Sequence, residues 1–274
     1  MRSVEVVRAV AKPVAGKAPG TYELTGLARG PWQEDAAHGG APAGLLARAA
    51  EALGAEDDLR LASLALAFNG PVPLGEVEIT AEIVKPGRRQ RVAAVSIRSG
   101  DRMLIEGRAV LIRRGEVDLP KGMVVEEEGF AGPDSGRPVE KELWADGDSE
   151  AFHRTANSVV AIEGGPDRVG TDGMVWIRLD YPLVTGEELS GAQRAVSAAD
   201  FGNGVAHPVG WGEYLFVNCD LTVSLLREPA GEWIGLESRT ELDRNGSGLT
   251  TTRLHDSEGR FGVATQILYV DRVG

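Results

Sequence analysis

The sequence has little cysteine, less positive than negative charge and no long hydrophobic run. Its 274 residues include a single cysteine, so no disulfide can form within the chain. Lys and Arg number 29 against 41 Asp and Glu, which gives a formal net charge of −12. Nonspecific nucleic-acid binding needs a positive surface, so this balance argues against a nucleic-acid partner.

The hydrophobic residues are too dispersed to predict a membrane protein. No apolar run approaches the roughly 20 residues that a membrane-spanning helix needs. The start of the sequence, Met1–Arg8, is charged and lacks the apolar core of a signal peptide. Together with the scarcity of cysteine, this predicts a cytoplasmic protein with no membrane partner.

The four histidines and the single cysteine are too far apart in the sequence to predict a metal centre. Neither a CxxC nor an HxxxH spacing occurs, so we expect no metal and no cofactor. The four histidines are His38, His153, His207 and His255.

The residues that are present predict a packed α+β protein. Hydrophobic residues make up 42% of the chain, enough for a buried core, which excludes a disordered protein. In the first half, residues 21–28 form a plausible strand, and an Ala/Leu-rich segment at 44–53 favours a helix. Four further strand patterns follow, at 59–68, 75–84, 91–98 and 103–113.

The second half repeats this plan after a segment rich in Pro, Gly and Glu at 115–150, which we interpret as a long connection. An Ala-rich helix is predicted at 191–201. The segment Pro73–Val77 matches Pro229–Trp233, which supports an internal duplication. Strands are predicted at 152–163, 174–182, 214–226, 233–242, 249–255 and 261–270.

A helix followed by a four-stranded antiparallel meander, occurring twice, predicts a double hotdog. This fold consists of two tandem repeats, in each of which a curved antiparallel sheet wraps an Ala-rich helix. We therefore predict an N-terminal hotdog at 1–120, a linker at 121–149 and a C-terminal hotdog at 150–274.

Four short motifs, in this order, resemble the acyl-CoA thioesterase II family over essentially the whole chain. His38-Gly39-Gly40 opens the first helix, and Ala198-Ala199-Asp200-Phe201 resembles the second helix of the family, in which a small residue precedes an Asp. Asn218–Val223 is similar to the family's strand with the catalytic Asp, and Gly262–Gln266 to its last strand.

The resemblance implies a site in which an Asp, a Ser or Thr and a Gln surround a water molecule. Asp220 matches the Asp position and Gln266 the Gln position. At the Thr position the sequence has Arg239, with Thr240 one residue later, and a shift of one residue turns a strand side chain to the opposite face. The expected catalytic residues are therefore Asp220, Thr240 and Gln266, with either Arg239 or Thr240 in the Thr position.

The expected chemistry is hydrolysis of an acyl-CoA to free acid and CoA, in fatty acid metabolism. The Asp would activate water as a general base, or attack the thioester itself and form a mixed anhydride. The start of the first helix would bind the substrate oxyanion through backbone N–H groups, because glycine lets a carbonyl approach closely. The expected residues are Gly39 and Gly40, with His38 beside them.

The residue pattern alone allows simpler interpretations. Asp220 alternates in phase with Asn218 and Thr222, which is typical of a solvent-facing strand residue. Gln266 can be a structural amide on its strand, and Asp200 a hydrogen-bonding residue at the end of a helix. The pair Gly39-Gly40 can be a turn.

Two other functions remain open. A hotdog enoyl-CoA hydratase would use Asp35 and His38 as its acid and base. A noncatalytic protein of this fold would hold an intact acyl ligand. In each case we expect a homo-oligomer, because exposed sheet edges favour pairing between copies.

Overall fold

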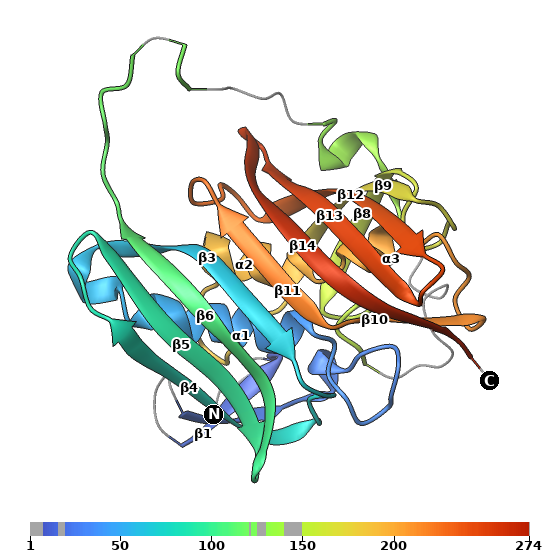
Figure 1. The fold of residues 1–274 in the computed structure, drawn as a ribbon, viewed down its shortest axis with the longest axis horizontal. Coiled ribbons are helices and arrows are strands. Elements are labelled where there is room, and N and C mark those ends of the chain that lie inside the picture. Colours follow the sequence, from blue (N-terminus) through green and yellow to red (C-terminus); the bar gives the residue numbers. More distant parts are fainter. Residues whose placement is uncertain (1–7, 16–19, 121, 125–129, 140–149, 274) are drawn as a thin grey trace, which may run out of the picture.

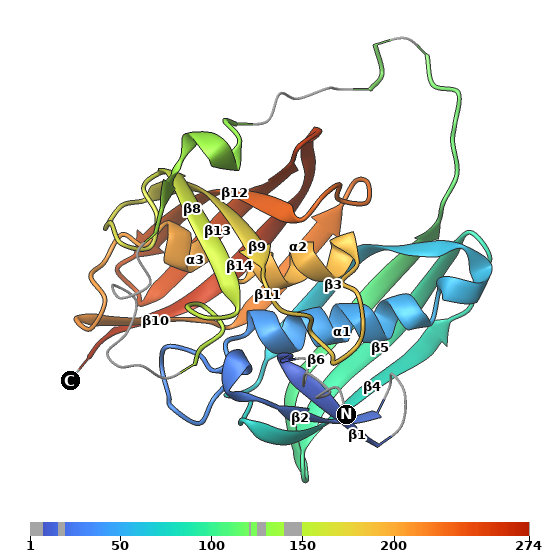
Figure 2. The ribbon, with the colours of Figure 1, turned by 180° about the vertical axis from the view of Figure 1, so that it is seen from behind.

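The computed structural model describes residues 8–15, 20–120, 122–124, 130–139 and 150–273. In this part of the chain, 14 strands form one antiparallel sheet, and the helices lie on one face of it (Figures 1 and 2). Thirteen strands follow one another across the sheet, in the order β1-β2-β4-β5-β6-β3-β11-β14-β13-β12-β9-β8-β7, and β10 pairs with β14 off this path.

The first half of the sheet has one helix, α1 (Gly40–Ala52). Its strands are β1 (Ala11–Ala15), β2 (Gly20–Leu24), β3 (Leu59–Phe68), β4 (Gly75–Lys85), β5 (Gln90–Ser99) and β6 (Arg102–Arg113). Short 3₁₀ turns lie at Gly26–Ala28 (η1) and Ala55–Asp57 (η2).

The second half has two helices, α2 (Gly191–Ala199) and the short α3 (Gly202–Val205). Its strands are β7 (Arg137–Pro138), β8 (Asn157–Glu163), β9 (Asp172–Leu179), β10 (Tyr214–Asn218), β11 (Asp220–Leu225), β12 (Trp233–Asp243), β13 (Ser247–Asp256) and β14 (Gly259–Arg272). One 3₁₀ turn, η3 (Pro133–Ser135), precedes β7.

The two halves of the sheet join through β3 and β11, which pair from Ser63 with Ser224 to Ala67 with Asp220. The strand order on either side of this junction is a mirror image. Moving outward, β3, β6, β5, β4 and β2 correspond to β11, β14, β13, β12 and β9. In each half the last three strands form a meander, β4-β5-β6 and β12-β13-β14. The prediction of four-stranded meanders was wrong at the first strand, because β3 pairs with β6 and β11 with β14 at the centre of the continuous sheet.

Helices α1 and α2 lie side by side on the same face of the sheet (Figure 2). Leu45 and Leu46 of α1 and Val196 of α2 are fully buried in one hydrophobic core that includes Leu64 of β3 and Leu221 of β11. The core is continuous across the junction between the halves. No helix of the described residues is long and apolar enough to cross a membrane.

Two predicted strands are shorter than the sequence suggested. The expected strand at 21–28 ends at Leu24, because the Thr25 side chain accepts a hydrogen bond from the Leu27 N–H and starts a 3₁₀ turn. The expected strand at 152–163 begins only at Asn157, whose side-chain amide donates to the Phe152 carbonyl oxygen at 2.7 Å and closes a turn. Local side-chain hydrogen bonds replace strand pairing in both segments.

The segment at 115–150 is not connection throughout. Within its described residues, η3 is followed by β7, which pairs with β8. These residues therefore belong to the sheet of the second half. Most of the predicted linker at 121–149, and the charged start at Met1–Arg8 except for its last residue, lie outside the described residues.

The expected strand at 214–226 is two strands with a break at Cys219, and the break reverses which side chains face the core. In β10 the even-numbered Phe216 is buried, whereas in β11 the odd-numbered Leu221 and Val223 are buried. Asn218 and Asp220, which alternation placed on one face, therefore lie on opposite faces.

Close contact between α1 and α2 depends on Gly44. A Cβ at this position would lie 2.1 Å from the Ser197 Oγ atom and 2.7 Å from a Leu183 methyl carbon. We expect Gly44→Ala to lower the free energy of unfolding by about 1–3 kcal/mol, despite the better helix propensity of Ala. Urea denaturation measures this change. Gly115→Ala is the matched control, because nothing lies within 4 Å of that Cβ, and an equal loss in both variants would contradict the explanation.

Candidate active site

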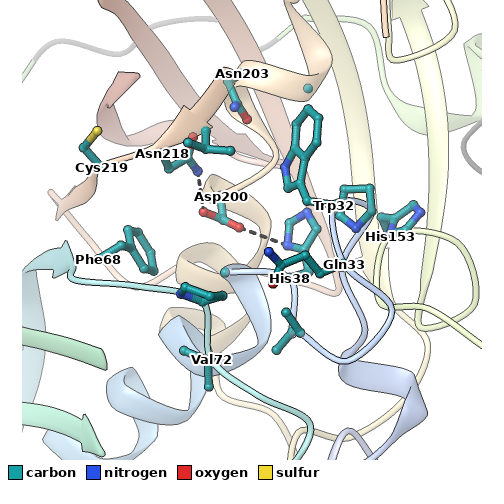
Figure 3. A pocket seen from close by; sticks show the side chains of 18 of the residues that line it. Trp32, Gln33, His38, Phe68, Val72, His153, Asp200, Asn203, Asn218 and Cys219 are labelled. Carbon is teal, nitrogen blue, oxygen red and sulfur yellow. Dashed lines mark hydrogen bonds and ion pairs between the residues drawn. The ribbon is translucent and has the colours of Figure 1, made fainter. Parts of the chain in front are cut away.

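A pocket of about 580 Å³ opens where the N-terminal end of α1 meets the C-terminal end of α2 (Figure 3). Both halves of the chain contribute to its wall. The polar residues lining it include His38, Asn69, His153, Asp200, Asn203 and Asn218. The apolar and aromatic residues include Trp32, Phe68, Val72, Phe201, Trp211, Leu215, Val217 and Tyr269.

Asp200 is the carboxylate of this pocket. It is the C-cap of α2, and it is 4% exposed. One carboxylate oxygen accepts a hydrogen bond from the Asn218 side-chain amide at 2.7 Å, and the other lies 2.9 Å from the His38 Nδ1 atom (Figure 3). A buried carboxylate needs such partners, so the two contacts fix its position.

His38 Nδ1 lies within hydrogen-bond distance of two groups. The Asp200 oxygen is 2.9 Å away, the length of an N–H···O hydrogen bond, which needs a proton between the two atoms. Gly40 N lies 3.1 Å away and can donate to Nδ1 only when Nδ1 carries no proton. In a neutral ring with its proton on Nδ1, the second nitrogen, Nε2, is a hydrogen-bond acceptor.

Glycine is required at the end of α1 that faces the carboxylate. A Cβ on Gly39 would lie 2.8 and 2.9 Å from the two Asp200 oxygens, and one on Gly40 would lie 2.5 Å from the Ser197 carbonyl oxygen. The Gly39 N–H has no hydrogen-bond partner in the part of the chain that is described. Gly39 and His38 line the pocket, and Gly40 lies behind them.

The Gln266 side chain is hydrogen-bonded to the backbone at the junction between α2 and α3. Its side chain is 1% exposed, and its amide group donates to the Asp200 carbonyl oxygen and accepts from the Asn203 N–H, both at 3.2 Å. A Cβ on Gly202 would lie 2.6 Å from both the Gln266 Oε1 atom and the Thr252 hydroxyl. Gln266 therefore fixes the backbone that carries Asp200, without itself lining the pocket.

The other two expected catalytic residues lie away from the pocket. Thr240 is 1% exposed, and its hydroxyl is hydrogen-bonded to that of Thr250 at 2.7 Å. Asp220 accepts a hydrogen bond from the Ile267 N–H at 2.6 Å, on the face of β11 opposite the core. Neither lines the pocket. The second-half carboxylate that lies beside Gly39 is Asp200 and not Asp220.

Arg239 is an exposed residue that pairs with Asp172 at 3.1 Å, so it does not substitute for a catalytic Thr. Asp35 is exposed and does not line the pocket, so the expected pairing of Asp35 with His38 is replaced by the pairing of His38 with Asp200. In the described residues, no group of three or more His, Cys, Asp or Glu side chains could hold a metal ion.

His153 lies beside His38, with ring centroids 6.2 Å apart, and it is 5% exposed. Burial, with smaller contributions from the neighbouring His38 and Arg154, lowers its pKa to about 3. His153 is therefore neutral at neutral pH and adds an uncharged imidazole to the pocket wall.

The low pKa of His153 predicts that the folded protein loses stability in acid. The unfolded chain binds a proton at His153 below its ordinary pKa of 6.5, whereas the folded protein does so only near pH 3, so stability falls as the pH falls through this window. Between pH 7 and pH 5, we expect His153 to account for a loss of about 2 kcal/mol in the free energy of unfolding.

Urea denaturation of the wild type and of His153→Phe at both pH values measures this contribution. His255 also has a pKa lowered by burial, and it is present in both proteins, so the difference between their pH dependences isolates His153. The same fall in stability in both proteins would contradict the proposed neutral state of His153.

The curved antiparallel sheet packed on two central helices, with the pocket at their ends, defines a hotdog protein. A protein with a hot dog fold from Alicyclobacillus acidocaldarius aligns at a TM-score of 0.71 and 14% identity, over 93% of this chain and 94% of that one. A candidate thioesterase II from Thermobifida fusca aligns at a TM-score of 0.72 and 18% identity, over 96% and 95%. An acyl-CoA thioesterase II from Mycobacterium marinum aligns at a TM-score of 0.64 and 12% identity, over 93% of this chain and 92% of that one.

Two family models match the sequence itself. The N-terminal domain of acyl-CoA thioesterases matches residues 28–112, and their C-terminal domain matches residues 130–270. The chain belongs to the acyl-CoA thioesterase family, as the sequence resemblance implied. No curated protein matches the sequence significantly.

Proposed function

We propose that this protein hydrolyses acyl thioesters, with CoA as the thiol, and that Asp200 is its catalytic carboxylate. The observation that carries the proposal is the position of Asp200. It is a buried carboxylate in the wall of a largely apolar pocket, with one hydrogen-bonding group on each oxygen and an unpaired backbone N–H, that of Gly39, beside it.

In the proposed reaction Asp200 accepts a proton from a water molecule as the water oxygen attacks the thioester carbonyl carbon. The carbonyl π electrons move to oxygen, and the resulting oxyanion accepts a hydrogen bond from the Gly39 N–H. Collapse of this intermediate breaks the C–S bond, and the departing thiolate takes up the proton. Direct attack by Asp200 would instead give a mixed anhydride, which water then hydrolyses.

His38 and Asn218 keep Asp200 in place during these steps, through the contacts at 2.9 and 2.7 Å. Gln266 acts one step further away, because its amide holds the backbone at Asp200 and Asn203. It is a positioning residue in this proposal. Thr240 and Asp220 have no direct part in it, since their oxygens are engaged outside the pocket.

A thiol-release assay across acyl-CoA substrates of different chain length tests the function. Release of CoA, with formation of the free acid, is the expected result. A protein that carries an intact acyl ligand through purification and releases no thiol from any thioester would instead be a binding protein. That result would contradict the proposal.

Hydration of an enoyl thioester is a second candidate, and the pairing of His38 with Asp200 favours it. A histidine and a carboxylate facing one apolar pocket can act as an acid–base pair on water and a conjugated double bond. Crotonyl-CoA distinguishes the two functions. Loss of its enoyl absorbance without thiol release would support a hydratase, and thiol release without prior hydration would support the hydrolase.

We also propose that the two halves are tandem hotdog repeats, the first at 1–120 and the second at 150–274, with β7 of the expected 121–149 linker added to the sheet of the second. The mirrored strand order, and the packing of α1 on the first set of strands and of α2 on the second, support this division. The proposal includes a homo-oligomer that pairs through sheet edges, for which sedimentation equilibrium of the purified protein is the test.

A further inference from the structure

The aromatic wall of the pocket is a feature that hydrolysis of a thioester does not by itself require. Trp32 comes from the loop before α1, and Trp211 from the loop before β10. Their ring centroids lie 5.4 Å apart, and both line the pocket. They are 40% and 41% exposed, whereas tryptophan side chains are highly buried on average.

The two indole rings are held in place from behind. Phe216 of β10 is 2% exposed, and it packs edge-on against Trp32 at 5.3 Å and against Trp211 at 4.7 Å. The Trp211 indole N–H donates to the Pro166 carbonyl oxygen at 3.2 Å, and the His207 ring lies 5.3 Å from the Trp211 ring. This wall is therefore formed before any ligand binds, and little ordering entropy is lost on binding.

Beside Gly40 and Gly44, α1 approaches α2 so closely that an added Cβ would collide with Ser197. Ser197 is itself fully buried. The contact between the helices at these residues therefore leaves no room for an acyl chain. The open pocket, whose wall includes the two tryptophans, offers that room to an acyl group attached to a thioester at Asp200.

We propose that the preferred substrates are thioesters whose short acyl group ends in an aromatic ring, which stacks on Trp32 and Trp211. This inference rests on the proposed function for the position of the thioester. A planar ring gains stacking contacts with the indoles beyond the burial of its area, and these contacts are lost for a linear chain. A linear chain of the same carbon number gains only the free energy of burying its apolar surface.

Phenylacetyl-CoA and octanoyl-CoA, with eight acyl carbons each, are the matched substrates for a test. We expect wild-type kcat/KM to be about tenfold higher for phenylacetyl-CoA. Trp211→Leu and Trp32→Leu should each lose most of this preference, through a rise in KM that is larger for phenylacetyl-CoA than for octanoyl-CoA. Trp233→Leu is the control, because this tryptophan lies on β12 under the Arg178 guanidinium, outside the pocket.

Binding separates this inference from the proposed hydrolysis. Calorimetry with analogues in which CH₂ replaces the thioester sulfur measures affinity even if the protein hydrolyses nothing. Tighter binding of the phenylacetyl analogue, lost in both pocket variants, supports the inference even if no thiol is ever released. Equal or tighter binding of the octanoyl analogue overturns it, and so does an equal loss for both analogues in the variants, even if hydrolysis is rapid.

Discussion

Replacement of Asp200 by Asn is expected to lower kcat for acyl-CoA hydrolysis about 10³-fold, the scale of a lost general base. Asn has almost the same shape, so it can keep the place of the carboxylate beside His38 and Asn218, but it neither accepts a proton from water nor forms an anhydride. KM should change little, because the wall that contacts the acyl group is intact. Thiol release under saturating substrate measures the effect.

Asp220→Asn is the matched control for this prediction. Asp220 accepts a hydrogen bond from the Ile267 N–H on the face of β11 opposite the core, so we expect its replacement to leave kcat within about threefold of the wild type. The opposite outcome, with activity lost at residue 220 and kept at residue 200, would restore the original sequence-based prediction and refute the site described above.

Replacement of Gly39 by Ala is expected to lower kcat about 100-fold. The backbone at Gly39 is already helical, with φ of −55° and ψ of −28°, so Ala causes no backbone strain. Its Cβ would instead lie 2.8 Å from an Asp200 oxygen, so the carboxylate must move away from its hydrogen-bonding groups. Steady-state kinetics measure the loss, and thermal denaturation monitors the fold.

Gly70→Ala is the control for the Gly39 variant, since Gly70 also lines the pocket but its Cβ would meet only an Arg102 nitrogen at 3.5 Å. We expect its activity to stay near that of the wild type. In an Asp200→Asn background, Gly39→Ala should lower kcat little further, because both changes act through the same carboxylate. Additive losses in the double variant would show that Gly39 acts independently of Asp200.

Regular alternation and turn residues predicted most strands of the sheet, but not β1 or β7. The expected 59–68 strand is β3, and the expected 103–113 strand differs from β6 by one residue. The errors in strand ends occur where a side chain competes with strand pairing, as Thr25 does after β2 and Asn157 does before β8. Such local hydrogen bonds leave no trace in a pattern of apolar and polar residues.

The sequence assigned the catalytic carboxylate to Asp220 and the proposal assigns it to Asp200, and the difference arises at the break at Cys219. A period of two continued through residues 214–226 puts Asn218 and Asp220 on one face, and the break puts Asn218 beside Asp200 and turns Asp220 outward. The useful signal was the segment Ala198-Ala199-Asp200-Phe201, where a carboxylate follows two small apolar residues at the end of a helix. Which carboxylate meets Gly39 depends on how α1 packs on α2, which no local pattern encodes.

That the glycines at the start of the first helix admit a substrate carbonyl stays a prediction. The structure adds a second reason for them, because Gly39 makes room for Asp200 and Gly40 for Ser197. The aromatic wall was not predicted, because Trp32 and Trp211 are 179 residues apart and meet only where the two halves join.

The central claim is that a substrate thioester lies against Asp200 in this pocket, and a crystal structure of the wild-type protein with an acyl-CoA analogue tests it most directly. In this analogue CH₂ replaces the thioester sulfur, so the ligand stays intact. The account predicts its carbonyl carbon within reach of the Asp200 carboxylate, directly or through one water, with the carbonyl oxygen facing the Gly39 N–H. An analogue whose carbonyl group lies elsewhere, with Asp200 still enclosed by His38 and Asn218 and touching no ligand, would contradict it.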